Sequence, residues 1–145
     1  MNLIDALQTS SSGLSAQRLR LNLISENIAN INTTHTYRGG PYIRKEPVFA
    51  AVNQNQSFGD ILKAHFSPEP SEVSVIDVVE DQRPPVLKYS PGHPEADKNG
   101  YVRMPNINIF EEMVNMISAS RSYEANVTAV NAAKSMAMKA LEIGR

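Results

Sequence analysis

The feature that most constrains this chain is an apolar repeat at each end, built from alternating steps of three and four residues. The first repeat occupies residues 3–31 and the second residues 113–141, and all nine prolines lie between them. A stripe that recurs about every 3.5 residues stays on one side of an α-helix only if the helix winds around a neighbour. The pattern therefore predicts two long terminal helices that pack together as a coiled coil of the antiparallel type.

The predicted stripes are mostly apolar, with a few polar members. On the first helix the stripe visits Leu3, Leu7, Ser10, Leu14, Gln17, Leu21, Ile24, Ile28 and Ile31. On the second helix it visits Met113, Met116, Ser120, Tyr123, Val127, Val130, Lys134, Ala137 and Leu141. The candidate helix–helix and assembly interface comprises most of these residues and three asparagines. Its members are Leu7, Leu14, Gln17, Leu21, Ile24, Asn27, Ile28, Asn30, Met113, Met116, Tyr123, Asn126, Val127, Val130, Lys134, Ala137 and Leu141.

Helix-boundary residues support the two helices. Asn2 is a suitable N-cap for the first helix, and Asn108 is one for the second. Glu111 and Glu112 place negative charge near the second N-terminus, where it complements the helix dipole. We expect each helix to be about 30 residues, or about 45 Å, long.

The central segment is predicted to be a small, irregular β unit, because prolines and glycines there break helices and mark turns. The best strand candidates are residues 73–79, 86–89 and 101–104. The spacing of apolar residues in 57–67 is compatible with both a short helix and a strand edge. The expected fold class is mainly α with a β-rich insertion (α+β). Its units are a helix over 1–32, an insertion over 33–107 and a helix over 108–145.

Composition excludes several classes of function. The 14 Lys and Arg residues are scattered among 15 acidic ones, so no basic patch predicts nucleic-acid binding. The chain has no cysteine, which removes disulfides, thiolate metal sites and cysteine nucleophiles. The beginning lacks a cationic stretch followed by an apolar run, and no apolar stretch is long enough to span a bilayer. We therefore expect neither a cleaved signal peptide nor a membrane span.

No catalytic constellation, metal site or cofactor site is predicted. The three histidines are not spaced as a helical metal pair. Glu95, Asp97, Asn99 and Gly100 match the start of an EF-hand calcium loop, but Asn106 stands where that loop needs a bidentate Glu. We interpret residues 97–100 as a polar turn before a strand.

Several blocks in the chain resemble the flagellar axial proteins of the rod, hook and filament cap. Residues 12–17, 27–30 and Thr33 are similar to the N-terminal signature of that family. Further blocks resemble the FlgC-type proximal-rod family specifically: residues 39–42, 91–94, 96–97, 100–102, 105–106, 112–113, 116–117, 119, 121–126 and 133–136. The least matched stretch is residues 51–72.

The resemblance implies a structural, non-enzymatic subunit of the bacterial flagellar basal body, exported by the flagellar type III machinery without a cleaved signal peptide. It would assemble into the rod that crosses the periplasm. Its implied partners are other copies of itself, other proximal-rod proteins, the membrane (MS) ring with its rod adaptor, and the distal rod protein. Transmission of torque from the ring to the distal rod and hook is the implied role.

Three questions remain open on the residues alone. Asn27 and Asn30 either mark a fraying helix end or hydrogen-bond between stacked subunits to fix register. The polar Gln17 and Lys134 allow similar alternatives, with Lys134 expected to extend its charge to the edge of the seam. A soluble adaptor that binds one partner through its helix pair is the main alternative to a polymerising subunit, and a hydrolytic enzyme has little support.

Overall fold

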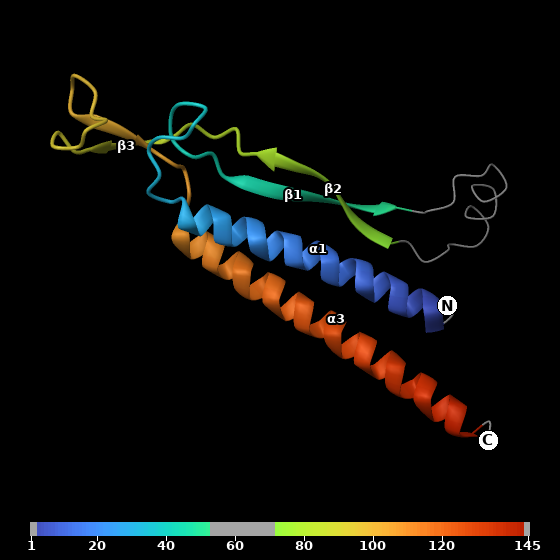
Figure 1. Ribbon diagram of the computed structural model, residues 1–145. Coiled ribbons are helices and arrows are strands. Elements are labelled where there is room, and N and C mark those ends of the chain that lie inside the picture. Colours follow the sequence, from blue (N-terminus) through green and yellow to red (C-terminus); the bar gives the residue numbers. More distant parts are fainter. Residues whose placement is uncertain (1–2, 53–71, 144–145) are drawn as a thin grey trace, which may run out of the picture.

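Two long antiparallel helices form the body of the molecule, with a β-ribbon along one of them (Figure 1). The computed structural model describes residues 3–52 and 72–143. Its elements are α1 (Leu3–Ala29), β1 (Lys45–Val52), β2 (Glu72–Glu80), β3 (Val86–Tyr89), β4 (Tyr101–Met104) and α3 (Ile109–Ile143). The expected fold class, mainly α with paired terminal helices and a β-rich insertion, is confirmed, and the described strands of the insertion pair antiparallel.

Helix α1 lies in the middle of the molecule. The ribbon of β1 and β2 runs along one of its sides and α3 along another, while β3 and β4 extend beyond the end where α1 stops and α3 starts (Figure 1). Among the described elements, only α1 packs on both the ribbon and the other helix. The described part of the chain is therefore elongated and has no central globular core.

Strand predictions are confirmed for three of the four strands in the described ranges. Residues 73–79 lie inside β2, and the ranges 86–89 and 101–104 coincide with β3 and β4. Strand β1 was missed. It contains Pro47, which argues against a strand because it cannot donate to a ladder, but a two-stranded ribbon leaves one edge of each strand free.

The β1–β2 ribbon is antiparallel and interrupted once. It pairs Lys45 with Glu80 at one end and Val52 with Glu72 at the other. The register shifts after Val48, which leaves Ile76 as an additional, exposed residue on β2. Such a bulge increases the local twist and helps a ribbon follow a helix.

The start of α3 has the predicted cap. The side-chain oxygen of Asn108 accepts a hydrogen bond from the Phe110 amide at 3.0 Å, and its carbonyl accepts one from the Glu112 amide at 3.0 Å. The predicted cap at Asn2 lies outside the described residues, as do residues 57–67, whose conformation the sequence left open.

Two contacts give the register of the helix pair. Asn27 hydrogen-bonds to Glu112, and Gly13 faces the side-chain amide of Asn126. The separation between Gly13 and Asn27 along α1 equals that between Glu112 and Asn126 along α3. Continuing this register places Leu3 opposite Met136. We call residues 137–143, which lie beyond Leu3, the α3 overhang. Neither described helix combines the length and apolar character that crossing a membrane requires.

The turn between β3 and β4 is held by Asp97. Its side-chain oxygen accepts hydrogen bonds from the amides of Asn99 and Tyr101 at 2.8 and 2.9 Å. Gly100 closes the turn with φ of 82°, and Tyr89 and Tyr101 pack edge to face at 5.3 Å. The interpretation of residues 97–100 as a structural turn is thus supported by the hydrogen bonds that Asp97 makes.

Replacing Gly100 tests this turn. Gly100→Ala should destabilise the β3–β4 hairpin by roughly 1–3 kcal/mol, since positive φ disfavours a side chain and the new Cβ would lie 2.9 Å from the Tyr89 ring. Gly92→Ala is the matched control, because nothing lies within 4 Å of the added Cβ there. Amide hydrogen exchange at Tyr101 measures the effect, and equal protection in both variants would contradict it.

Candidate functional site

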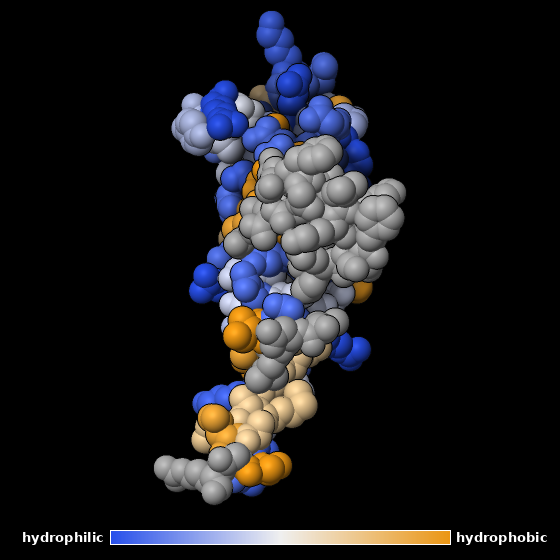
Figure 2. All heavy atoms as spheres, turned by 90° about the vertical axis from the view of Figure 1, so that its right-hand side faces the viewer, coloured by the Kyte–Doolittle hydropathy of each residue, from blue (hydrophilic) through white to orange (hydrophobic). Residues whose placement is uncertain are grey.

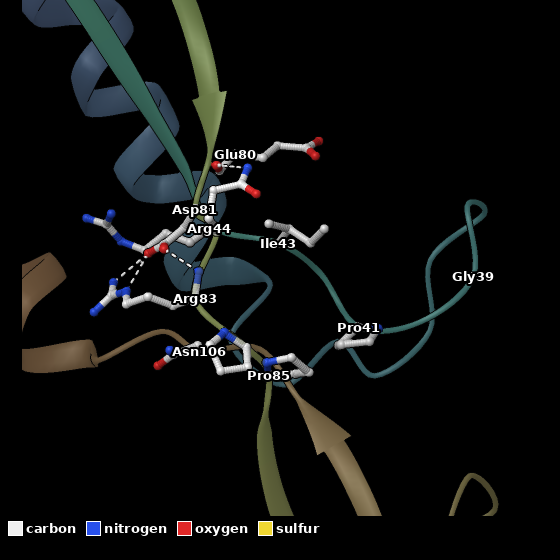
Figure 3. A pocket seen from close by; sticks show the side chains of 11 residues that line it. Gly39, Pro41, Ile43, Arg44, Glu80, Asp81, Arg83, Pro85 and Asn106 are labelled. Atoms are coloured by element: carbon white, nitrogen blue, oxygen red, sulfur yellow. Dashed lines mark hydrogen bonds and ion pairs between the residues drawn. The ribbon is translucent and has the colours of Figure 1, made fainter.

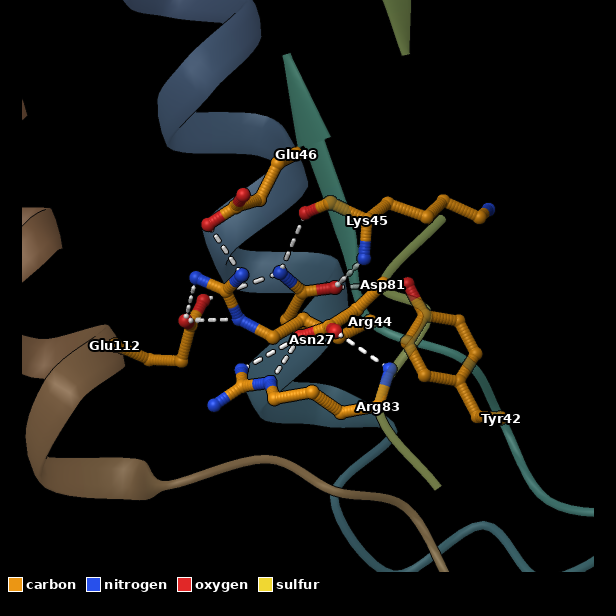
Figure 4. Close-up of polar contacts among 8 residues, drawn as sticks. All are labelled: Asn27, Tyr42, Arg44, Lys45, Glu46, Asp81, Arg83 and Glu112. Atoms are coloured by element: carbon orange, nitrogen blue, oxygen red, sulfur yellow. Dashed lines mark hydrogen bonds and ion pairs between the residues drawn. The ribbon is translucent and has the colours of Figure 1, made fainter. Parts of the chain in front are cut away.

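Three segments that are distant in sequence meet at a buried polar cluster (Figure 4). Asn27 comes from the last turns of α1, Arg44 from the residue before β1, and Glu112 from the first turn of α3. Two of these side chains are almost fully buried, with exposed fractions of 1% for Asn27 and 0% for Glu112. We call Asn27, Tyr42, Arg44, Lys45 and Glu112 the polar cluster.

Asn27 uses its whole side-chain amide within the cluster. Its nitrogen donates to the Lys45 carbonyl at 2.9 Å and to Glu112 Oε2 at 3.1 Å. Its oxygen accepts from the Lys45 amide at 3.0 Å and from the Tyr42 hydroxyl at 3.0 Å. Because an amide side chain has two donors and two acceptor positions, Asn27 is saturated.

Glu112 and Arg44 form a buried ion pair. Glu112 Oε1 accepts hydrogen bonds from Arg44 Nε at 2.8 Å and lies 2.7 Å from Nη2. Nη1 of the same guanidinium pairs with the half-exposed Glu46. Removing two charges from water is costly, so such a pair is stabilising only where further hydrogen bonds complete it. Asn27 supplies one of those bonds, and the first turn of α3 favours a negative charge.

Surrounding groups hold the cluster in place. Lys45 Nζ pairs with Glu26 Oε1 at 2.6 Å and lies 5.5 Å from the centre of the Tyr42 ring. Burial, followed by the nearby Glu26 carboxylate, raises the pKa of Tyr42, which stays a neutral donor to Asn27. Although burial opposes its charge, hydrogen bonds with Glu46 and Glu112 raise the pKa of Arg44.

A shallow groove of about 410 Å³ lies beside the cluster (Figure 3). Arg83 donates to Asp81 through Nε at 2.8 Å and Nη2 at 2.5 Å, and these hydrogen bonds lower the pKa of Asp81. The Asp81 amide in turn donates to the Arg44 carbonyl at 2.8 Å. Arg83 and Asp81 therefore tie the end of β2 to the segment that carries the buried guanidinium.

The arrangement fits a structural function better than a catalytic one. The Asn27 amide is saturated, and the charged groups of Arg44 and Glu112 are directed at each other and at protein partners. In the part of the chain that the structure describes, no three acidic, His or Cys side chains come together as a metal site would require. The cluster can join α1, α3 and the ribbon in one register.

The predicted interface residues of α1 all lie in buried or half-buried positions. Ile24 and Asn27 are buried, and the half-buried ones are Leu7, Leu14, Gln17, Leu21, Ile28 and Asn30. The Gln17 side-chain oxygen is buried without a hydrogen-bond partner among the described residues. The hypothesis that Asn27 bonds between subunits needs correction, because its amide is saturated inside the chain.

Asn30 also bonds locally. Its side-chain nitrogen donates to the Glu26 carbonyl at 2.9 Å, and its oxygen accepts from the Thr33 hydroxyl at 3.1 Å. These contacts hold the turn that follows α1. Asn30 thus ends the helix in a defined way, whereas the sequence left open fraying or a bond between subunits.

The row of α3 residues that packs against α1 differs from the predicted stripe at several positions. Met113, Val127 and Lys134 are exposed, whereas the residue before each of them is buried or half-buried. Met116, Tyr123, Asn126, Val130 and Ala137 are half-buried, and Leu141 in the overhang is 72% exposed. Within one chain, therefore, Met113, Val127, Lys134 and Leu141 do not form the buried seam.

This difference has a physical cause. The positions that do face α1 carry Glu112, Ala119, Asn126 and Ala133, which are polar or small. A pattern based on large apolar residues therefore does not identify these positions. Small residues let two helix backbones approach closely, and Gly13 contributes to this, since an added Cβ would lie 3.1 Å from the Asn126 nitrogen.

Sequence reasoning missed Tyr42, Arg44 and the burial of Glu112. The sequence indicates a role for Glu112 at the N-terminal end of the helix dipole, which its position in the first turn of α3 also supports. The available signal was its spacing of seven residues from Ala119 and fourteen from Asn126, which places it on the seam. No local motif marks Arg44.

Large apolar side chains remain exposed on α3. Phe110, Met113, Val114 and Ile117 are 75%, 49%, 66% and 54% exposed, and we call these four residues the outer α3 patch. Figure 2 shows a second apolar group over the end of α3, where Met138, Leu141 and Ile143 are exposed. Exposed patches of this kind mark surfaces that contact other molecules.

Comparisons with known proteins agree with this structural interpretation. Residues 7–35 match the family model described as flagella basal body rod protein, and residues 98–143 match that of the C-terminal region of flagellar basal body rod FlgEFG proteins. The chain is 45% identical to the flagellar basal-body rod protein FlgC of Borreliella burgdorferi, over 99% of this chain and 98% of the relative. It is 41% and 40% identical to FlgC of Bacillus subtilis and Salmonella typhimurium, over the full length of each.

Glu112→Gln tests the buried ion pair. We expect the free energy of unfolding to fall by about 3 kcal/mol, because the Arg44 guanidinium would stay buried without its main counter-charge. Glu46→Gln is the matched control, since it changes the exposed partner of the same guanidinium and should cost less than about 1 kcal/mol. Urea unfolding followed by circular dichroism measures both, and equal costs would contradict the assignment.

Alkaline pH tests the burial of Tyr42. Because the pKa of Tyr42 is raised, its contribution is fully present below about pH 10 and is lost as the pH rises from there towards the folded-state pKa. Tyr42→Phe should therefore lose less stability above pH 10 than the unmodified chain. Tyr37→Phe, at a 92% exposed ring, is the control. Parallel stability curves for all three proteins between pH 9 and 11 would refute this.

Proposed function

The chain belongs to the FlgC family of flagellar basal-body rod proteins, and on that premise we propose that it is a proximal-rod subunit that polymerises through its terminal helices. It is a structural component of the flagellar basal body. The observation that carries the proposal is the outer α3 patch, whose four large apolar side chains lack cover from the described chain.

The helix pair supports the proposal because it is unfinished as an isolated fold. One seam of α3 packs on α1, the opposite side carries the outer α3 patch, and the α3 overhang lies beyond α1. Neighbouring subunits would bury these surfaces. In this arrangement residues 1–32 and 108–145 form the assembly unit, and residues 33–107 act as spacer and lateral contact. Met113, Val127, Lys134 and Leu141 are then candidates for contacts between subunits.

The polar cluster supports a role in transmitting torque. A seam of apolar and small side chains can slide with little specificity, whereas a saturated amide and a buried ion pair accept only one register. Torque passing through the helix pair would then reach the ribbon without relative movement. We infer that this coupling lets the subunit transmit torque from the membrane ring towards the distal rod and hook.

The remaining elements of the proposal rest on the family. They comprise assembly with other copies, with other proximal-rod proteins, with the membrane ring and its adaptor and with the distal rod protein, and a location that crosses the periplasm. Export through the flagellar type III machinery is compatible with a helix pair that buries few apolar side chains, since such a pair unfolds readily. We propose no catalytic activity.

Val114→Asp tests the polymerisation surface. This variant should fold, because Val114 is 66% exposed, yet its incorporation into isolated basal bodies should fall roughly tenfold or more, with loss of swimming. Thr128→Asp places the same charge at an exposed position of α3 outside the outer α3 patch and should leave both unchanged. Immunoblotting of basal bodies from cells that lack the native copy provides the measurement. Normal incorporation of Val114→Asp would refute the proposed surface.

A further inference from the structure

A second groove, of about 290 Å³, lies where α1, β1 and the start of α3 meet. Its apolar lining includes Leu23, Ile24, Pro47 and Phe49, and its polar lining includes Arg20 and Asn115. Its volume is close to the lower limit for small-molecule pockets, which is about 300 Å³. The groove is therefore suited to a single protruding side chain.

The charge at the groove is incompletely balanced. Arg44 is shared between Glu46 and Glu112, and Lys45 is paired with Glu26. Arg20 makes no hydrogen bond or ion pair with another described residue. An occupant that brings an apolar side chain together with an acidic one would complement both the lining and the free guanidinium.

The chain itself carries such a pair at the start of α3. Phe110 is 75% exposed and has no ring contact among the described residues, and the adjacent carboxylate of Glu111 is exposed without a direct ion pair there. The other strongly exposed aromatic rings of the described ranges have partners, since Tyr37 contacts Arg38 and Tyr89 packs against Tyr101. Among the described residues, Phe110 is thus the aromatic side chain best placed to enter a neighbouring groove.

Phe110 cannot fill the groove of its own chain. Glu112 and Asn115 line the groove, whereas Phe110 lies two residues before Glu112, about 200° around the helix at about 100° per residue. The acidic aromatic segment and the groove therefore face different directions on one subunit. Contacts between two different surfaces join copies head to tail, which generates rings or helical filaments.

We propose that Phe110 of one copy enters the groove of a second copy, with Glu111 paired to Arg20 across the interface. This inference rests on the proposed polymerising function and specifies one contact between copies. It assigns the groove of about 290 Å³ as the acceptor and the start of α3 as the donor. The contact uses one end of the outer α3 patch and leaves the α3 overhang for other neighbours.

A charge exchange tests the pair. Arg20→Glu and Glu111→Arg should each lower incorporation into basal bodies roughly tenfold or more, because like charges would face each other across the interface. The double variant should recover most of the loss. Arg18→Glu and Glu124→Arg, at exposed positions of the same helices, are matched controls that should incorporate normally. Circular dichroism of each purified variant verifies that the fold is retained.

The outcomes separate this contact from the proposed function. If the unmodified chain is found in basal bodies but folded single variants incorporate normally, or the folded double variant fails to recover, the contact is wrong and the rod function stands. If the unmodified chain is absent from basal bodies, both are wrong.

Crosslinking gives an independent measurement. Because the chain has no cysteine, Arg20→Cys with Glu111→Cys introduces the only thiols. The double-cysteine chain is assembled together with unmodified chain and treated with a thiol-specific crosslinker. The crosslinked products should have masses that are multiples of the chain mass. Arg18→Cys with Glu111→Cys should give no such ladder. Equal ladders in both, or links only to a protein of different mass, would overturn the contact between copies.

Discussion

The buried pair of Glu112 and Arg44 is the interaction on which the rest of the structure depends. Both charges are withdrawn from water, so each becomes acceptable only when the other and Asn27 are in place. Those three residues come from α1, the segment before β1, and α3. Correct assembly of the cluster therefore requires correct placement of all three segments at once, which links the helix register to the position of the ribbon.

This dependence follows from how little apolar material the chain buries. The largest fully buried side chains among the described residues are Glu112, Val102 and Asn27, two of which are polar. A seam of alanines and half-buried aliphatic residues holds two helices together but defines their relative shift poorly. The cluster supplies the missing specificity, while the apolar seam supplies most of the attraction.

An elongated chain with a specific but narrow interior exposes much of its apolar surface. The outer α3 patch and the α3 overhang lie on α3, whereas the groove near Arg20 lies where α1, β1 and the start of α3 meet. We propose that neighbouring subunits cover these exposed surfaces. That proposal agrees with membership of a family whose members are named for the rod that they form.

The sequence by itself determined the two terminal helices, their antiparallel pairing, the cap at Asn108 and three of the four strands that the structure describes. Each of these depends on local periodicity or on a turn residue within a short window. Only the tertiary structure decided that Glu112, rather than Met113, faces α1, and that Arg44 and Tyr42 join Asn27. The reason is physical: a polar residue is stable in the interior only if its partners arrive from elsewhere in the chain, and no local pattern records those partners.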